Sequence, residues 1–253
     1  MTEPNIAIQL RGLSKRFGRQ EVLRDVHLDI PAGASVALTG ANGAGKTTLL
    51  RCMASVLRPT AGEVRWFGRS AWRNPDARRL IGTVAHQSGL YPHLTLRENL
   101  VFAARMCDVP KPLRRADELL SSLGLQASAD RTPAEVSQGM RQRVALARGL
   151  IHDPAILFLD EPFSGLDVAG TQWLCGLLDE LHALERTVCF AVHDPDMVRR
   201  LADTVLELRS GRVEHHDVAA LKPDAQARED ANLSLAGASG FNGLRCAGCG
   251  RAA

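Results

Sequence analysis

The sequence has no run of apolar residues that approaches the length of a membrane span. A transmembrane helix needs about 18 or more consecutive, predominantly apolar residues, and no stretch of this 253-residue chain comes near that. The first residues, Met1-Thr2-Glu3-Pro4-Asn5, lack both the charged and the apolar segment of a secretory signal. We therefore expect a cytosolic chain whose role at a membrane, if it has one, depends on a partner.

An excess of charge of one sign is also missing. The 31 Lys and Arg residues nearly balance the 28 Asp and Glu residues, and the net charge is +3. Nucleic-acid binding usually requires a clustered basic face, so we expect no nucleic-acid partner. In a cytosolic chain the six cysteines should be reduced thiols, and four lie in apolar runs typical of small core residues: Cys52, Cys107, Cys175 and Cys189. Internal repeats are absent as well.

A complete phosphate-loop pattern, G-x-x-x-x-G-K-[ST], is present in the first third of the chain. Its residues are Gly40, Ala41, Asn42, Gly43, Ala44, Gly45, Lys46 and Thr47. Residues 35–39 before it predict a buried strand, and residues 47–57 after it predict a helix. In that setting backbone N–H groups surround a phosphate chain and the helix N-terminus adds positive potential. Lys46 would reach the β- and γ-phosphates, and Thr47 would ligate Mg²⁺. The alternative, a glycine-rich turn with a chance Lys-Thr pair, lacks this context.

The rest of the chain predicts an α/β core with a helical insertion. Alternating apolar residues over 6–30 indicate antiparallel strands, and a strand-like pattern returns over 63–87. We expect helices over 96–104, 112–124 and 139–151, within an insertion at about residues 88–152. The α/β pattern then resumes with strands at 155–159 and 187–192, a helix at 171–185, and a closing hairpin formed by 204–208 and 212–215. Residues 222–253 show no periodicity and predict a disordered tail.

Two further segments suggest phosphate chemistry. An apolar strand ends in Asp160 and Glu161; the first is placed to hold Mg²⁺, and the second can act as general base. A strand that simply ends in acidic residues is the alternative. Ser137 is a good helix N-cap with Gly139 close by, which makes a ready anion site. Because the chain already has a phosphate loop, this second anion site requires another role.

Together these motifs resemble those of the ABC-type ATPases, and they occur in that family's order. The motifs are the phosphate loop, Gln87 after a strand, the segment 137–143, Asp160-Glu161, the segment 164–167, and His193. The match covers about residues 6–216, which we take as the ATPase domain. The resemblance implies an α/β P-loop NTPase fold of ABC type, with an N-terminal antiparallel β-subdomain and an inserted α-helical subdomain. It also implies ATP and Mg²⁺ as ligands.

The resemblance implies a head-to-tail dimer with a second copy of the chain or a homologous ATPase subunit. Each nucleotide would lie between the phosphate loop of one subunit and the signature of the other, here Ser137, Gln138 and Gly139. This arrangement would give the second anion site its role, contact with the partner's γ-phosphate. The commonest signature is Leu-Ser-Gly-Gly-Gln; this chain keeps the Ser and the second Gly, and its departures are Val136, Gln138 and Met140.

The resemblance implies the same roles for Glu161, Thr47 and Asp160 and adds further ones. Phe17 would stack on adenine in place of the commoner Tyr, and Thr48 would join the phosphate loop. Glu161, His193 and Gln87 would be catalytic, with Glu161 as base and His193 on the γ-phosphate. Mg²⁺ would be held by Thr47, Gln87 and Asp160, and Asp167 would report across the dimer interface. Taken singly, Phe17 could be an ordinary core residue and His193 a merely hydrogen-bonded one.

Two kinds of ABC protein are the alternatives. One is the ATPase subunit of a membrane transporter, attached to the cytoplasmic face of the membrane through integral membrane subunits. The alternative is a soluble ABC ATPase that acts in translation or DNA repair, and the single cassette, the short insertion and the balanced charge disfavour it. The segments 86–91, 137–143 and 161–167 are similar to those of the haem-exporter ATPase of cytochrome c maturation, which predicts an exporter of haem or a related small molecule. We expect the membrane subunit to contact the loop around Tyr91, His93 and Leu94.

The C-terminal tail contains a C-x-x-C pattern, Cys246-Ala247-Gly248-Cys249. A structural zinc site normally takes four ligands, and no second pair lies nearby. An incidental pair in a disordered tail, a zinc site shared between two tails and a redox pair all remain open.

Overall fold

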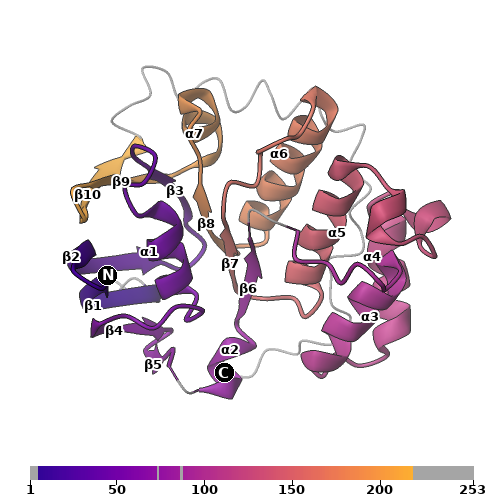
Figure 1. The fold of residues 1–253 in the computed structure, drawn as a ribbon, viewed down its shortest axis with the longest axis horizontal. Coiled ribbons are helices and arrows are strands. Elements are labelled where there is room, and N and C mark those ends of the chain that lie inside the picture. Colours follow the sequence, from indigo (N-terminus) through magenta and orange to yellow (C-terminus); the bar gives the residue numbers. More distant parts are fainter. Residues whose placement is uncertain (1–4, 73, 86–87, 219–253) are drawn as a thin grey trace.

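The computed structural model describes residues 5–72, 74–85 and 88–218 of the chain, and Figure 1 shows their arrangement. Gln87, the expected disordered tail at 222–253 and its Cys246 and Cys249 lie outside the described residues. Among the helices of the described part, none is both long enough and apolar enough to cross a bilayer.

A six-stranded sheet forms the centre of the fold, with strand order β10-β9-β3-β8-β7-β6. The strands are β3 (Ser35–Thr39), β6 (Ile81–Val84), β7 (Ile156–Leu159), β8 (Thr187–Ala191), β9 (Thr204–Arg209) and β10 (Arg212–Asp217). All neighbours pair in parallel except the hairpin of β9 and β10. Leu157 and Leu159 face one hydrophobic cluster, while Ile156 and Phe158 face the other. Because both faces are covered, these strands are continuous apolar runs without polar alternation.

A second, antiparallel sheet is formed largely from the N-terminal residues. It contains β1 (Ile6–Phe17), β2 (Gln20–Pro31), β4 (Ala61–Trp66) and β5 (Arg69–Ser70), in the order β2-β1-β4-β5. Its buried residues share one hydrophobic cluster with α1 (Lys46–Met53) and with one face of the six-stranded sheet. Helix α1 therefore lies where the two sheets meet, which places the phosphate loop between them (Figure 1).

Helices cover the opposite face of the six-stranded sheet. The longest is α6 (Val168–Ala183); α5 (Gln138–Leu150) and α7 (Pro195–Leu201) also contribute to its hydrophobic cluster. The same cluster continues into α3 (Leu96–Met106) and α4 (Pro112–Ser122), which form a helical layer at one side of the molecule (Figure 1). Two short 3₁₀ turns, Gln126–Ser128 and Pro133–Glu135, connect α4 to α5.

Several elements differ from the sequence-based expectation. Helix α1 ends at Met53 rather than at residue 57, because Ser55 adopts a left-handed φ of 52° and the amides of Val56 and Leu57 both bond back to Arg51. Helix α6 begins three residues earlier than expected. The short helices α2 (Pro75–Arg78) and α7 were not expected. Cys52, Cys175 and Cys189 are buried as predicted, whereas Cys107 is only half-buried at the end of α3.

Candidate functional site

The phosphate loop follows β3, and its last two residues, Lys46 and Thr47, are the first two residues of α1. Two of its glycines are required by close packing. At Gly40 a Cβ would lie 2.6 Å from the carbonyl oxygen of Leu208, and at Gly45 it would lie 2.9 Å from Val22 Cγ1. Both residues also have left-handed φ angles, 131° and 107°. A side chain at either position would therefore push the loop away from its neighbouring strands.

Lys46 is buried within the loop that it belongs to. Its Nζ donates to the carbonyl oxygens of Gly40 at 2.9 Å and Ala41 at 3.1 Å. Burial lowers the pKa of Lys46, while the nearby carboxylates of Glu161 and Asp160 act in the opposite direction. A desolvated ammonium group is stabilised by an incoming polyanion, so this position suits a lysine that binds phosphate.

Thr47 and Asp160 form the candidate magnesium site. The Thr47 hydroxyl donates to Asp160 Oδ1 at 2.9 Å, although the two residues are separated by 113 positions in the sequence. Asp160 comes directly after β7 and is buried. A hydroxyl oxygen beside a carboxylate is a donor set that Mg²⁺ prefers, so these residues fit the ion. Gln87, the third expected ligand, lies outside the described residues.

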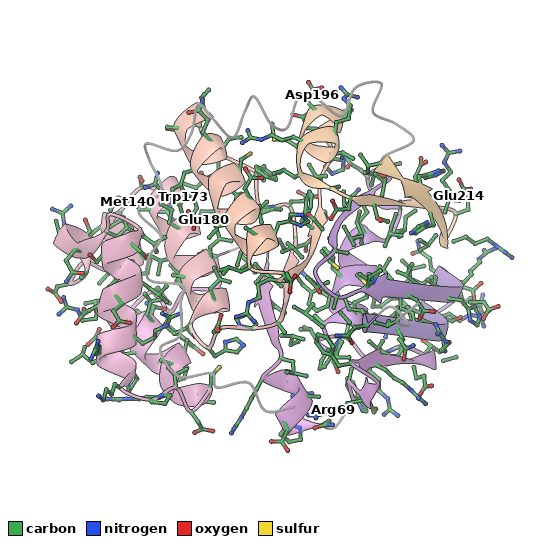
Figure 2. All side chains as sticks on the ribbon, turned by 180° about the vertical axis from the view of Figure 1, so that it is seen from behind. Arg69, Met140, Trp173, Glu180, Asp196 and Glu214 are labelled. Carbon is green, nitrogen blue, oxygen red and sulfur yellow. The ribbon has the colours of Figure 1, made fainter. Side chains whose placement is uncertain are left out.

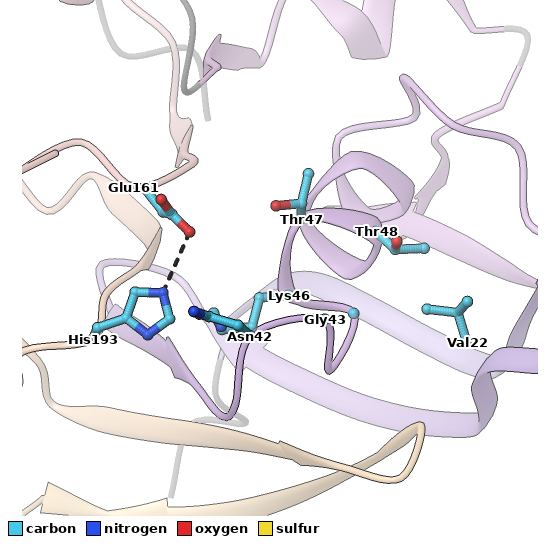
Figure 3. A pocket seen from close by; sticks show the side chains of 9 residues that line it. Val22, Asn42, Gly43, Lys46, Thr47, Thr48, Glu161 and His193 are labelled. Atoms are coloured by element: carbon cyan, nitrogen blue, oxygen red, sulfur yellow. Dashed lines mark hydrogen bonds and ion pairs between the residues drawn. The ribbon is translucent and has the colours of Figure 1, made fainter.

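Glu161 and His193 lie opposite each other beside the phosphate loop. His193 Nε2 lies 3.3 Å from Glu161 Oε1, which Figure 3 shows as a dashed line. Glu161 has a left-handed φ of 51°, which turns the chain sharply after β7. His193 follows β8, the strand that lies between β3 and β7. Ligand sites in open α/β sheets lie at the carboxyl ends of the strands, and here three adjacent strand ends contribute.

Most of these groups line one pocket of about 800 Å³, and Asp160 is linked to it through its hydrogen bond with Thr47. Its residues are Val22, Asn42, Gly43, Gly45, Lys46, Thr47, Thr48, Glu161 and His193 (Figure 3). The structure thus brings together most of the expected phosphate-binding residues, both carboxylates and the histidine. Val22, on β2, was not expected; only its packing against Gly45 brings it to the pocket, and its local sequence carries no signal of that contact.

The signature residues lie elsewhere in the chain's own fold. Ser137 caps α5, and its hydroxyl accepts a hydrogen bond from the Met140 amide at 3.3 Å. Neither Ser137, Gln138 nor Gly139 is among the residues that line the pocket. Figure 2 places Met140, on the same helix, and Glu214, on the β9–β10 hairpin, on opposite sides of the molecule. The second anion site is therefore not part of the phosphate-loop pocket of the same chain.

Two other expected site residues have structural contacts of their own. Asp167 caps α6, accepting a hydrogen bond from the Gly170 amide at 2.7 Å. Phe17, at the end of β1, is half-exposed, and Lys15 Nζ lies 5.0 Å from the centre of its ring. Phe17 does not line the pocket, although an exposed ring is free to stack on a base.

Comparison with known protein families and sequences gives a consistent result. The family model described as ABC transporter matches residues 23–164, which is more than half of the chain. The sulfate/thiosulfate import ATP-binding protein CysA of Escherichia coli (strain K12) is 38% identical over 235 residues, covering 89% of this chain and 63% of that protein. Its counterpart in Gloeobacter violaceus is 39% identical over 215 residues, covering 83% and 62%. This chain thus spans less than two thirds of the length of these relatives.

Solved structures with the same arrangement include a dimeric ATP-binding cassette in a post-hydrolysis state with ADP and inorganic phosphate. It has a TM-score of 0.75 and 28% identity, covering 83% of this chain and 98% of that one. An ATP-binding subunit of an ABC transporter has a TM-score of 0.77 and 28% identity, covering 92% and 95%.

Proposed function

The chain belongs to the ABC transporter family, and from this premise we propose that it is the ATP-hydrolysing, nucleotide-binding subunit of a membrane transporter. The observation that carries the proposal is the pocket in which the phosphate loop, Glu161 and His193 converge. Each of these groups has a defined task in phosphoryl transfer to water.

The chemistry requires the bond between the γ-phosphorus and the β–γ bridging oxygen to break while water attacks the phosphorus. Glu161 accepts a proton from that water, and His193, hydrogen-bonded to Glu161, keeps the carboxylate directed at it. Lys46 neutralises charge on the β- and γ-phosphates. Thr47 and Asp160, together with Gln87, would hold Mg²⁺, which would supply further charge neutralisation.

The separation of Ser137 from the pocket supports a composite site built by two subunits. The amides at the capped start of α5 point away from the helix body and offer an anion site that the chain's own pocket does not use. A second copy, or a homologous subunit, placed head to tail would bring its Ser137, Gln138 and Gly139 to the γ-phosphate, with Asp167 at the interface. The dimeric cassette among the similar structures is consistent with this arrangement.

The partners we propose are integral membrane subunits that hold the chain at the cytoplasmic face of the membrane. Tyr91 and Phe102 form an edge-to-face pair with ring centres 5.0 Å apart, yet both rings remain partly exposed. Tyr and Phe are enriched at protein–protein interfaces, which supports a contact at this exposed pair. We place the membrane contact on this pair and the adjoining His93 and Leu94.

The similar proteins change the expectation that the transporter exports haem or a related small molecule. The predicted similarity to a haem exporter of cytochrome c maturation has no support among these relatives, which are named as sulfate/thiosulfate importers. We propose import as the direction of transport. The substrate itself is selected by the membrane subunit, so we assign none from the residues of this chain.

The test of the proposed function is the substitution Glu161→Gln. It removes the base while preserving size and polarity, so ATP should still bind. Turnover should fall by about 10²–10⁴-fold, the usual contribution of general-base assistance. The variant should also accumulate an ATP-bound dimer, measured by size-exclusion chromatography with light scattering. Asp194→Asn, at the cap of α7, removes a nearby carboxylate outside the pocket and serves as the control. Wild-type turnover in Glu161→Gln would contradict the assignment.

A further inference from the structure

Helix α5 makes a contact that the proposed chemistry does not use. Near its C-terminal end, the Arg148 guanidinium donates a hydrogen bond to the carbonyl oxygen of Gly89. Gly89 has a left-handed φ of 56°, and a Cβ there would lie 3.0 Å from an Arg148 nitrogen. The left-handed backbone at Gly89 favours glycine, and a side chain there would have to displace the tip of the Arg148 side chain.

The other end of the same loop is fixed by a fully buried asparagine of α3. Asn99 Oδ1 accepts from the Tyr91 amide at 2.7 Å. Asn99 Nδ2 donates to the carbonyl oxygens of Tyr91, Leu94 and Thr95 at 3.2, 3.1 and 2.9 Å. Residues 88–95, which we call the 88–95 loop, are thus tied to α3 by Asn99 and to α5 by Arg148.

Helix α5 also contacts the chain segment that carries Glu161, the proposed general base. The buried amide of Gln142 donates to the carbonyl oxygen of Pro162 at 3.3 Å, one residue after Glu161. The Gly89 and Pro162 segments follow β6 and β7, which are adjacent parallel strands. One helix therefore contacts both the loop where the membrane subunit is proposed to dock and the segment that carries Glu161. Its first turn, at Ser137, lies about 16 Å from Arg148 along the helix axis.

From these contacts we infer that Arg148 is a positioning residue that couples the 88–95 loop to the signature end of α5. The inference rests on the proposed function, because the loop is the proposed membrane contact and Ser137 the proposed trans site. An α-helix moves as a unit, so a displacement of the loop is passed through Arg148 to Ser137, and closure of the dimer on Ser137 is passed back to the loop. In this proposal Arg148 contacts neither the nucleotide nor the attacking water molecule.

The test uses the full chain with the Glu161→Gln substitution, which should trap the ATP-bound dimer. Amide hydrogen exchange of the 88–95 loop is measured with and without ATP. With Arg148 present, ATP should slow exchange in the loop; with Arg148→Met, the dimer should still form but loop exchange should stay at its nucleotide-free rate. Arg148→Lys, which keeps a donor, should restore part of the response. Arg114→Met removes an exposed arginine of α4 that pairs with Glu118, and should behave like the parent.

A second measurement uses the native membrane complex captured through a tag on this chain. Arg148→Met, without the Glu161 substitution, should leave ATP turnover of the free chain unchanged. The stimulation of turnover by the membrane subunit should fall toward unity. A purely structural role for Arg148 would lower both activities together.

The outcomes separate this inference from the proposed function. If the Arg148→Met dimer shows the parent's ATP-dependent protection of the loop, the coupling role is wrong while the proposed function stands. If Arg148→Met does not fold, Gly89→Ala displaces the same contact from the loop side. Gly89→Ala should then lose the response, and a normal response would overturn the inference. A Glu161→Gln chain that never dimerises with ATP would overturn the proposed function and, with it, this inference.

Discussion

At the scale of single residues, His152 shows how a buried contact makes stability depend on pH. His152 follows α5, and its Nε2 lies 2.8 Å from the carbonyl oxygen of Ile81 on β6. Its Nδ1 is buried and has no hydrogen-bond partner among the described residues. In the neutral form Nε2 donates to Ile81 and Nδ1 carries only a lone pair. Protonation would bury an unpaired N–H, and burial accordingly lowers the pKa of His152, against the opposing influences of the Ile81 carbonyl and Asp153.

The lowered pKa of His152 determines how the free energy of unfolding changes with pH. In the unfolded chain the imidazole titrates near pH ~6.5, and in the folded chain it titrates lower. The contribution of His152 to the free energy of unfolding should be fully present above pH ~6.5, and should be lost as the pH falls from there through the folded pKa. We expect His152→Gln, which keeps a donor for Ile81, to flatten the pH dependence of the urea midpoint between pH 8 and 5. Parallel curves for His152→Gln and wild type would contradict the prediction.

At the scale of elements, the start of α6 combines two roles in one side chain. Asp167 is the expected reporter at the dimer interface and is also the N-cap of this helix. Asp167→Ala should lower the free energy of unfolding by about 1 kcal/mol, the usual effect of losing a cap. Asp167→Asn keeps a capping oxygen and should preserve most of that stability while removing the charge at the interface. Urea denaturation of the two variants measures the cap, and their ATPase activities at matched stability measure the interface. Equal stability of the Ala and Asn variants would show that the cap contributes little.

Some elements were predictable because their local sequence and their final environment agree. Two central strands were correctly predicted, 35–39 and the strand before Asp160, because an apolar run buried on both faces leaves a clear pattern. The phosphate loop was predicted from its own sequence pattern. The leucine stripe places the start of α6 at Thr171, whereas the helix begins at Val168 because the Asp167 side chain caps it. Helix α7 has only seven residues and buries few of them, so its pattern is weak even with the Asp194 cap and Pro195 at its first position.

In the site, too, some residues were predictable from the sequence and others were not. The phosphate loop, Asp160, Glu161 and His193 were expected from motifs. Most of the loop, Glu161 and His193 line one pocket, and Asp160 is bonded to Thr47 of that pocket. Val22 was missed because a β2 residue enters the pocket only through its packing on Gly45, a contact between two different layers. Arg148 and Gly89 are separated by 59 positions, and neither residue type signals such a contact in advance.

At the scale of the whole molecule, the fold class is confirmed as an ABC-type P-loop NTPase with an antiparallel β-subdomain and a helical subdomain. The separation of Ser137 from the pocket predicts that hydrolysis needs two chains. Lys46→Ala should disable the phosphate loop, and Ser137→Arg should block the partner's γ-phosphate by bulk and misplaced charge. Each variant alone should be inactive. An equal mixture with free exchange should make roughly a quarter of the sites complete and recover a corresponding part of the ATPase activity.

The mixing experiment has an internal control. A mixture of Lys46→Ala with the double variant Lys46→Ala/Ser137→Arg contains no intact phosphate loop and should stay inactive. Subunit exchange is monitored separately with differently labelled chains. Mixed dimers that form without recovering activity would remove the support for a composite site.

The order of strands in the central sheet also fixes the scale of the reaction. Lys46 follows β3, His193 follows β8 and Glu161 follows β7, and β8 lies between the other two. Neighbouring strands are about 4.8 Å apart, so the strand ends that precede the phosphate loop and Glu161, the proposed base, lie roughly 10 Å from each other. That gap spans a terminal phosphate together with a water molecule. The backbone hydrogen bonds between the strands therefore set the width of this gap. Changes in the surrounding loops would alter which side chains reach into the gap but would leave its width the same.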